Sequence, residues 1–214
     1  MTVAENCHLT PNYSLLILQP KSISDWDNKE NPFTFFDILP GQFVQVRIDQ
    51  SKTTFLRRPI SVNFVYPDKK ELHLLVRRAG KGTEALCDIK TGDNLNVILP
   101  LGNGFSLPSE EETAIGYYPL LVGGGVGVAP LLYLGKLLRD RGINPSFLLA
   151  AKNEKDLLLI DKFKEFGTVY VSTDDGSAGT PGLVTANPAL NEQWSKIYCC
   201  GPMPMMKAIA RIAK

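Results

Sequence analysis

The hydrophobic pattern of the chain changes near residue 108, and this change constrains the fold more than any other feature of the sequence. Before it, short apolar runs such as 60–66 (ISVNFVY) are separated by clusters of turn residues. That spacing is typical of a meandering antiparallel barrel or sandwich. After residue 116, apolar strands alternate with amphipathic helical segments, which indicates a parallel sheet covered by helices. We therefore predict two domains, residues 1–108 and residues 112–214.

Local patterns place the elements within each domain. In the first domain, short extended runs separated by turn residues predict strands at 14–19, 42–48, 60–66, 71–78 and 95–100. One helix is predicted there over 82–89, with Thr83 as its N-cap. In the second domain the patterns predict strands at 119–124, 145–151, 168–173 and 195–201, and helices at 129–142, 154–167 and 203–214.

Composition excludes several classes of function. The formal net charge is +1 at pH 7 and like charges form no run, so neither nucleic acid nor an anionic membrane is predicted as a partner. No apolar segment reaches the ~18 residues of a membrane span, and the N-terminus lacks a signal-peptide pattern, so a cytoplasmic protein is predicted. The four cysteines (Cys7, Cys87, Cys199 and Cys200) contain no C-x-x-C spacing, and the two histidines stand far apart. We predict reduced thiols and no metal site.

A cluster of four glycines, Gly123, Gly124, Gly125 and Gly127, lies between a predicted strand and a predicted helix. Such a turn lets backbone N–H groups and a helix N-terminus face a phosphate. The G-x-G-x-x-G fingerprint is not met, because its frame ends on a valine or a proline. A nucleotide loop of another kind is favoured, and a tight turn with close packing is the alternative.

Two segments of the first domain also have the chemistry of phosphate sites. Arg58 precedes Pro59 at the start of a strand, so its guanidinium can offer a bidentate fork, and Ser61 adds a hydroxyl nearby. The alternative is a solvated basic edge that protects a strand. The second segment, 80–83 (GKGT), ends a strand and begins a helix, which again favours an anion.

Four short motifs together resemble the ferredoxin-reductase superfamily. They are Arg58-Pro59-Ile60-Ser61, Gly80-Lys81-Gly82-Thr83, 123–130 (GGGVGVAP) and Cys200-Gly201-Pro202. The resemblance covers essentially the whole chain. It implies an α+β two-domain protein, in which an antiparallel β-barrel FAD domain precedes an α/β parallel-sheet nicotinamide domain. Within the superfamily, segments 99–105, 172–185 and 198–209 are similar to the electron-transfer subunits of bacterial type B dihydroorotate dehydrogenases.

The resemblance also implies roles for individual residues. The residues it assigns to FAD are Arg58, Pro59, Ile60, Ser61, Leu75, Val76, Arg77, Gly80, Gly82 and Thr83, with 73–78 along the isoalloxazine. The residues it assigns to NAD are Gly123, Gly124, Gly125, Gly127, Cys200, Gly201 and Pro202, with Cys200 near the nicotinamide as the candidate catalytic residue. For most cysteines, a small buried side chain is the ordinary role.

Two acidic residues bear on the choice of nucleotide. Asp174 and Asp175 follow the predicted strand 168–173. An acidic group at that edge would repel a 2′-phosphate and accept a hydrogen bond from a free ribose hydroxyl, which favours NAD over NADP. An ordinary Asp-Gly turn is the alternative.

The sequence departs from the family in one respect. Family members carry four further cysteines that bind a [2Fe–2S] cluster, and none of this chain's four has ferredoxin spacing. The final predicted helix reaches Lys214 with no capping residue, so an iron–sulfur domain is expected beyond it; a cluster-less member is the alternative.

The resemblance implies electron transfer between NAD and an FMN-containing dihydroorotate dehydrogenase catalytic subunit, in a heterotetramer that serves pyrimidine biosynthesis. Two other functions stay open. One is the flavin subunit of a hydrogenase or of a ferredoxin:NADP oxidoreductase. The other is a non-catalytic FAD- and NAD-binding redox sensor.

Overall fold

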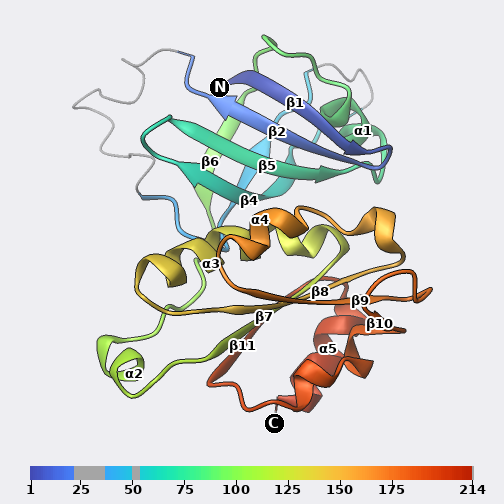
Figure 1. The fold of residues 1–214 in the computed structure, drawn as a ribbon. Coiled ribbons are helices and arrows are strands. Elements are labelled where there is room, and N and C mark those ends of the chain that lie inside the picture. Colours follow the sequence, from blue (N-terminus) through green and yellow to red (C-terminus); the bar gives the residue numbers. More distant parts are fainter. Residues whose placement is uncertain (22–36, 50–53, 214) are drawn as a thin grey trace. The chain divides into compact units, whose positions relative to one another are not determined.

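The chain divides into two compact units, Met1–Phe105 and Ser106–Lys214. The computed structural model describes residues 1–21, 37–49 and 54–213, and Figure 1 shows the two units as separate sheets with their helices. In those three ranges, no helix is both long enough and apolar enough to cross a membrane.

The first unit is an antiparallel six-stranded sheet that curls into a barrel, in the order β1-β2-β5-β4-β3-β6. Its strands are β1 (Thr2–Thr10), β2 (Tyr13–Gln19), β3 (Phe43–Val46), β4 (Arg58–Tyr66), β5 (Glu71–Arg77) and β6 (Val97–Leu101). The segment just before β6 bonds back to β1, because the Val3 N–H donates to the Asp93 carbonyl (2.9 Å) and the Leu95 N–H to the Met1 carbonyl (2.8 Å). These bonds join the two edges of the sheet, so the predicted antiparallel barrel is confirmed.

Strand β1 was not predicted from the sequence. Of its nine residues only Val3 is buried, and most of the others are polar and half-buried or exposed. By contrast, Leu72 to Val76 of β5 are all buried, since β5 lies in the middle of the sheet. The pattern of apolar residues therefore predicts the central strands of this sheet but not its mostly polar edge strand β1.

Strands β4 and β5 separate partway along their length. Their antiparallel pairing runs from Tyr66↔Glu71 to Val62↔Leu74 and ends there. Beyond that point, residues 58–61 of β4 pair with β3, while residues 75–77 of β5 pair with β2. The backbone edges that face each other across this divergence have no ladder partner in either strand, which leaves them available to other groups.

Helix α1 (Lys81–Cys87) follows β5 directly, with Gly80 at its N-cap position. The prediction that Thr83 caps this helix is wrong, because Thr83 lies inside the first turn. Its hydroxyl accepts from the Ala79 N–H (2.9 Å) and donates to the Gly80 carbonyl (3.0 Å). Thr83 thus stabilises the turn that leads into α1.

The second unit is a parallel five-stranded sheet in the order β10-β9-β8-β7-β11. Its strands are β7 (Pro119–Gly124), β8 (Ser146–Ala151), β9 (Thr168–Thr173), β10 (Thr180–Pro181) and β11 (Lys196–Cys200). Its helices are α2 (Glu110–Ala114), α3 (Ala129–Asp140), α4 (Ile160–Lys164) and α5 (Met203–Ile212), with 3-10 turns η3 (Gly125–Val128), η4 (Glu154–Asp156), η5 (Val184–Ala186) and η6 (Pro188–Asn191). Figure 1 shows α3 and α4 on one face of the sheet and α5 on the other. The predicted parallel α/β domain is confirmed.

The helix predicted over 154–167 is wrong in its extent. The segment forms the 3-10 turn η4 and then the short helix α4, and between them Leu159 has a left-handed backbone with φ of 57°. The Asn153 side chain accepts from the Asp156 N–H (3.1 Å), which fixes the tight turn. The break lets both Leu158 and Phe163 reach the interior, where the Phe163 ring packs edge-on against Phe147 at 5.0 Å.

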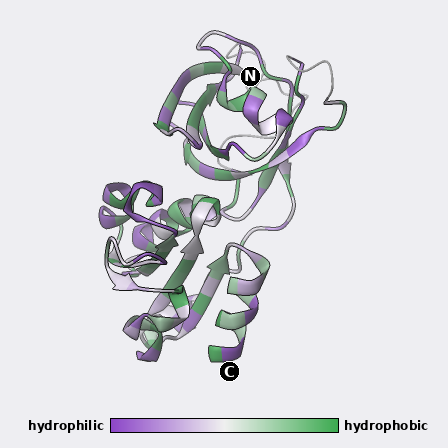
Figure 2. Cartoon of the chain, turned by 90° about the vertical axis from the view of Figure 1, so that its right-hand side faces the viewer, coloured by the Kyte–Doolittle hydropathy of each residue, from purple (hydrophilic) through white to green (hydrophobic). Residues whose placement is uncertain are grey.

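Each unit has its own core. The strands of both units carry most of the hydrophobic colour in Figure 2, while hydrophilic residues lie on helix and loop surfaces. Between the second sheet and α5, a cluster of buried residues is formed by Leu120, Val122, Leu148, Val184, Leu190 and Ile209. In the second unit, the predicted site residues lie in the loops that follow the carboxyl ends of the parallel strands β7, β9 and β11.

Candidate functional site

In the first unit, the predicted site residues gather around the divergence of β4 and β5. Residues 58–61 begin β4, residues 75–77 end β5, and Gly80 to Thr83 follow at the start of α1. Three segments that are separate in the sequence therefore lie near the point where the pairing of β4 and β5 ends.

The two adjacent arginines have different surroundings. The Arg57 guanidinium donates to the Gln45 carbonyl (3.2 Å) and the Asn96 carbonyl (3.0 Å), and also to the Asn96 side chain. Arg57 thus joins β3 to the segment before β6. Arg58 instead makes one long contact with the Arg57 carbonyl, at 3.5 Å, and its side chain lies against Gly82. Arg57 is tied to the barrel, while Arg58 is placed beside the start of α1.

Gly82 is required by this arrangement. A Cβ at Gly82 would lie 2.5 Å from the Arg58 Nε atom and 3.2 Å from the Thr54 Cγ2 atom. A side chain at position 82 would displace the Arg58 side chain from this place, so glycine allows Arg58 to lie against the first turn of α1. A Cβ at Gly80 would meet nothing within 4 Å, so the space beside Gly80 is open. The first N–H groups of a helix have no intrahelical acceptor, and here a guanidinium lies next to them.

The other predicted flavin residues differ in what they can offer. The side chains of Ile60, Leu75 and Val76 are buried in the barrel, so only their backbone can meet a ligand. Pro59 and Arg77 are exposed and Ser61 is half-buried. The isoalloxazine contact predicted for Leu75 and Val76 is therefore compatible with their main chain and not with their side chains.

In the second unit, the glycine loop lies at the topological switch point of the sheet. Strand β7 has β8 on one side and β11 on the other, and ligands of open α/β sheets bind at the carboxyl ends of strands at such a point. Gly123 and Gly124 end β7, and Gly125 and Gly127 lie in η3, directly before α3. Helix α3 begins at Ala129 with Pro130 in its first turn, as the sequence predicts.

Gly127 brings this loop against the end of β11. A Cβ there would clash with the Cys200 carbonyl oxygen and with the Gly201 Cα. Cys200 also pairs with Gly123 across the parallel ladder. The predicted glycine loop and the Cys200-Gly201-Pro202 segment are thus adjacent.

The two neighbouring cysteines face opposite sides of the sheet. Cys199 packs against the cluster beneath α5, so Cys200 points to the other face, because successive strand residues alternate. Both are free thiols. Burial raises the pKa of Cys199 to about 11 and raises the pKa of Cys200 above its ordinary value. At neutral pH Cys200 is therefore an uncharged thiol.

The two acidic residues after β9 are not equivalent. The Asp175 carboxylate accepts from the Ser177 N–H (3.0 Å) and from the Ser177 hydroxyl (2.6 Å). These hydrogen bonds hold the pKa of Asp175 below its usual range. Asp174 is exposed at the end of β9, and its backbone N–H donates to the Ala151 carbonyl at 3.0 Å. Three inter-strand spacings, about 14 Å, separate β9 from β11.

Several residues that shape the two regions were not found from the sequence. Thr54 contacts Gly82, and Met205 lies between Gly124 and Gly201. The buried Asn187 side chain reaches Val171, Ser172 and Thr180, which anchors the loop after β9. None of these residues belongs to a local sequence motif. Within the described ranges, no group of three or more His, Cys, Asp or Glu side chains could hold a metal ion.

Comparison with known proteins links these features to named relatives. A family described as "Oxidoreductase NAD-binding domain" matches residues 121–211. The chain is 41% identical over 173 residues to the dihydroorotate dehydrogenase B (NAD(+)) electron transfer subunit of Shouchella clausii, covering 79% of this chain and 65% of the relative. It is also 41% identical over 177 residues to the Fusobacterium nucleatum protein of the same name, covering 79% and 66%. The chain thus spans about two thirds of the length of these relatives.

Solved structures agree on the fold. A NADH-dependent reduced ferredoxin-NADP oxidoreductase, studied for flavin-based electron bifurcation, matches with a TM-score of 0.78 and 29% identity over 99% of this chain and 71% of its own. The FAD/NAD-binding domain of a nitric oxide dioxygenase from Vibrio cholerae shares the fold with a TM-score of 0.78 at 18% identity, over 99% of this chain and 90% of its own. The chain therefore has a ferredoxin-reductase-like fold with an oxidoreductase NAD-binding domain, and over the region that it shares with them it is similar to the electron-transfer subunits of dihydroorotate dehydrogenase B.

Proposed function

We propose that this chain binds FAD in its first unit and NAD in its second, and carries electrons between NAD and a dihydroorotate-oxidising partner. The observation that carries the proposal is the convergence of Arg58 and Gly82 beside the divergence of β4 and β5. It occurs in a chain whose relatives are named electron transfer subunits.

The residues of the first unit suit the pyrophosphate of FAD. Arg58 supplies a charge that can form paired hydrogen bonds with phosphate, and the turn at Gly80 leaves open space beside free N–H groups. Residues 75–77 offer backbone groups along the flavin, and Ser61 offers a hydroxyl. When bound, FAD would accept a hydride from NADH and release electrons one at a time.

The residues of the second unit suit NAD. The glycine loop at the end of β7 allows close approach of a pyrophosphate, and Cys200 presents a neutral thiol near the predicted nicotinamide position. An uncharged, partly buried group there excludes water without competing for the hydride. Asp174, which lies about 14 Å from β11 across the sheet, is positioned for the adenosine ribose of an extended dinucleotide.

The partner and the second redox centre are also part of the proposal. We propose that a [2Fe–2S] cluster, held by cysteines outside these 214 residues, links FAD to an FMN-containing catalytic subunit in a heterotetramer. The support is the name of the relatives and their greater length. The cytoplasmic location is proposed from composition alone.

Anaerobic stopped-flow mixing tests the core of this proposal. The FAD-loaded chain is mixed with NADH, and flavin absorbance near 450 nm is followed. Rapid loss of that absorbance is expected, because hydride transfer requires only the two nucleotide sites. Binding of NADH without reduction of the flavin would instead identify a redox sensor.

A second candidate function rests on a specific observation. The 29% identity to the reduced ferredoxin-NADP oxidoreductase structure favours a flavin subunit that serves ferredoxin. The two functions separate when the full gene product is assayed with dihydroorotate and its dehydrogenase subunit, and in parallel with reduced ferredoxin. Activity with ferredoxin alone would support the second candidate.

A further inference from the structure

Three buried polar residues of the second unit lie together where β9 ends. Apart from tyrosines, they are the buried polar residues in the described part of this unit: Ser172 and Thr173 are 0% exposed, and Asn187 is 4% exposed. Burying a polar group costs free energy unless the group is hydrogen-bonded, and a fully bonded polar network makes its surroundings rigid. Here the network borders the loop that follows β9 and begins with Asp174.

The Asn187 side chain joins three elements. Its Nδ2 atom donates to two groups of β9, the Val171 carbonyl (3.2 Å) and the Ser172 hydroxyl (3.0 Å). The same atom donates to the Thr180 hydroxyl of β10 (3.1 Å). The Oδ1 atom accepts from the Ala189 N–H of η6 (3.0 Å). Both ends of the amide are therefore bonded to the protein, and they tie β9, β10 and η6 to one another.

The β9–β10 loop, residues 174–179, is closed on the end of β9. The Thr173 hydroxyl accepts from the Ala178 N–H (2.9 Å) and donates to the Ala178 carbonyl (2.8 Å). Gly179 has a left-handed backbone with φ of 65°, and a Cβ there would clash with the Val171 carbonyl oxygen. The loop thus returns directly against β9, so its position follows that of the two strand ends.

The direction of the Asp174 side chain depends on this frame. Asp174 is exposed and is the first residue of the β9–β10 loop, and its backbone N–H donates to the Ala151 carbonyl (3.0 Å). Its backbone follows directly on the two buried β9 residues that are bonded to Asn187 and to the loop. A group that selects between ligands must be held in a fixed place by the residues around it. The buried amide of Asn187 therefore bears on what Asp174 can select.

We propose that Asn187 is a positioning residue for nucleotide selection, which fixes the ends of the β9–β10 loop and so keeps the Asp174 carboxylate at the adenosine ribose of NAD. Asn187 does not bind the nucleotide itself, because its amide atoms are already bonded to protein groups. The inference rests on the proposed function, since it assumes that the ribose of NAD lies at Asp174.

A double-mutant cycle tests whether Asn187 acts through Asp174. The FAD-loaded protein is assayed with ferricyanide as acceptor, and kcat/KM for NADH is divided by kcat/KM for NADPH. Asn187→Leu removes the amide at similar volume. It is expected to narrow this ratio roughly three- to fivefold, mainly through a higher KM for NADH, with kcat changed less than about twofold. In an Asp174→Ser background the same substitution is expected to leave the ratio nearly unchanged, because the group that Asn187 positions is gone.

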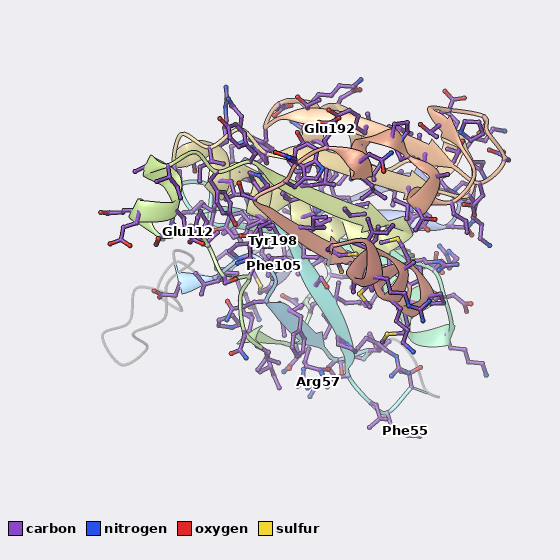
Figure 3. All side chains as sticks on the ribbon, turned by 90° about the horizontal axis from the view of Figure 1, so that it is seen from below. Phe55, Arg57, Phe105, Glu112, Glu192 and Tyr198 are labelled. Atoms are coloured by element: carbon purple, nitrogen blue, oxygen red, sulfur yellow. The ribbon has the colours of Figure 1, made fainter. Side chains whose placement is uncertain are left out.

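Tyr170→Phe is the matched control. The Tyr170 hydroxyl of β9 donates to the carboxylate of Glu192 (3.2 Å), an exposed residue that directly follows η6 and is labelled in Figure 3. This hydrogen bond joins β9 to the end of η6, as Asn187 joins β9 to η6, but it does not reach β10. The variant is therefore expected to keep the wild-type ratio.

The outcomes separate positioning from stability. A wild-type ratio in folded Asn187→Leu protein, with only a lower midpoint of urea unfolding, would overturn the inference. An equal narrowing in the Asp174→Ser background or in Tyr170→Phe would also overturn it, because selection would then not run from Asn187 through Asp174. If circular dichroism shows that Asn187→Leu does not fold, Thr180→Val takes its place in the cycle with the same criteria, since it is isosteric and removes the hydroxyl that Asn187 meets on β10.

Failure of the inference is distinguishable from failure of the proposed function. Equal wild-type values of kcat/KM for NADH and NADPH would overturn the inference, because there would be no selection to position, yet would leave flavin reduction intact. A wild-type flavin that neither nucleotide reduces would contradict the proposed function itself.

Discussion

At the scale of single residues, the two adjacent arginines are expected to have different roles, Arg58 in FAD binding and Arg57 in the stability of the fold. Arg58→Ala removes a charge-assisted contact to phosphate worth about 1.5–3 kcal/mol, so FAD affinity is expected to fall roughly 10- to 100-fold. Arg57→Ala breaks hydrogen bonds to Gln45 and Asn96. It is expected to lower the free energy of unfolding by about 1–2 kcal/mol, measured in urea. Full flavin occupancy in purified Arg58→Ala protein would contradict the assignment of Arg58.

The two aspartates after β9 are also expected to have different roles, one in selecting the nucleotide and one in holding the turn. Asp175 is held by Ser177, while Asp174 is exposed. Asp174→Ser removes a charge that would repel a 2′-phosphate by about 1 kcal/mol at 4 Å in water. The preference for NADH over NADPH, measured as the ratio of kcat/KM values, is expected to narrow about fivefold. Asp175→Ser is expected to loosen the turn and to change the ratio less. If the wild type reacted equally fast with NADH and NADPH, Asp174 and Asp175 would form an ordinary turn with no role in nucleotide selection.

At the scale of elements, Met205 of α5 joins two loops at the carboxyl edge of the second sheet. A Cβ at Gly124 would lie 2.5 Å from the Met205 sulfur, and a Cβ at Gly201 would lie 2.7 Å from its methyl carbon. Met205→Ala is therefore expected to let the loops separate and to raise the KM for NADH, with FAD content unchanged. Met205→Leu has nearly the same volume and should keep the wild-type KM. A drop in kcat at constant KM would argue against this positioning role.

Elements were predictable where their own residues specify them. Strands β2, β4, β5, β7 and β8 have buried apolar residues along most of their length, and the glycine loop and Arg58-Pro59 are local motifs. Strand β1 was missed because its partners bury only Val3, and the helix over 154–167 was broken by the demands of packing at Leu158 and Phe163. Likewise, Thr54 and Met205 act through tertiary contacts that no local pattern contains. The divergence of β4 and β5, which brings the flavin motifs together, is a property of pairing and not of either strand alone.

At the scale of the whole molecule, the 214 residues are expected to form one part of a longer path for electrons. Each unit has its own proposed nucleotide region, so the FAD-loaded chain should oxidise NADH and reduce ferricyanide, which accepts one electron at a time. It should not pass electrons to an FMN-containing dihydroorotate dehydrogenase subunit, because its cysteines at positions 7, 87, 199 and 200 lack ferredoxin spacing. About one third of the length of each relative lies outside the matched region, which leaves room for a cluster domain.

The decisive measurement combines an iron assay with a coupled assay on the product of the complete gene. A product that continues beyond Lys214 with four cysteines is expected to contain about two irons per chain and to couple dihydroorotate oxidation to NAD reduction. Matched serine variants of those cysteines should lose iron and coupling together, yet retain the reduction of ferricyanide by NADH, because that reaction needs only FAD and the NAD site. An iron-free product that still couples dihydroorotate to NAD would show that electrons reach this flavin without a cluster, and the proposed path would then be wrong at that step alone.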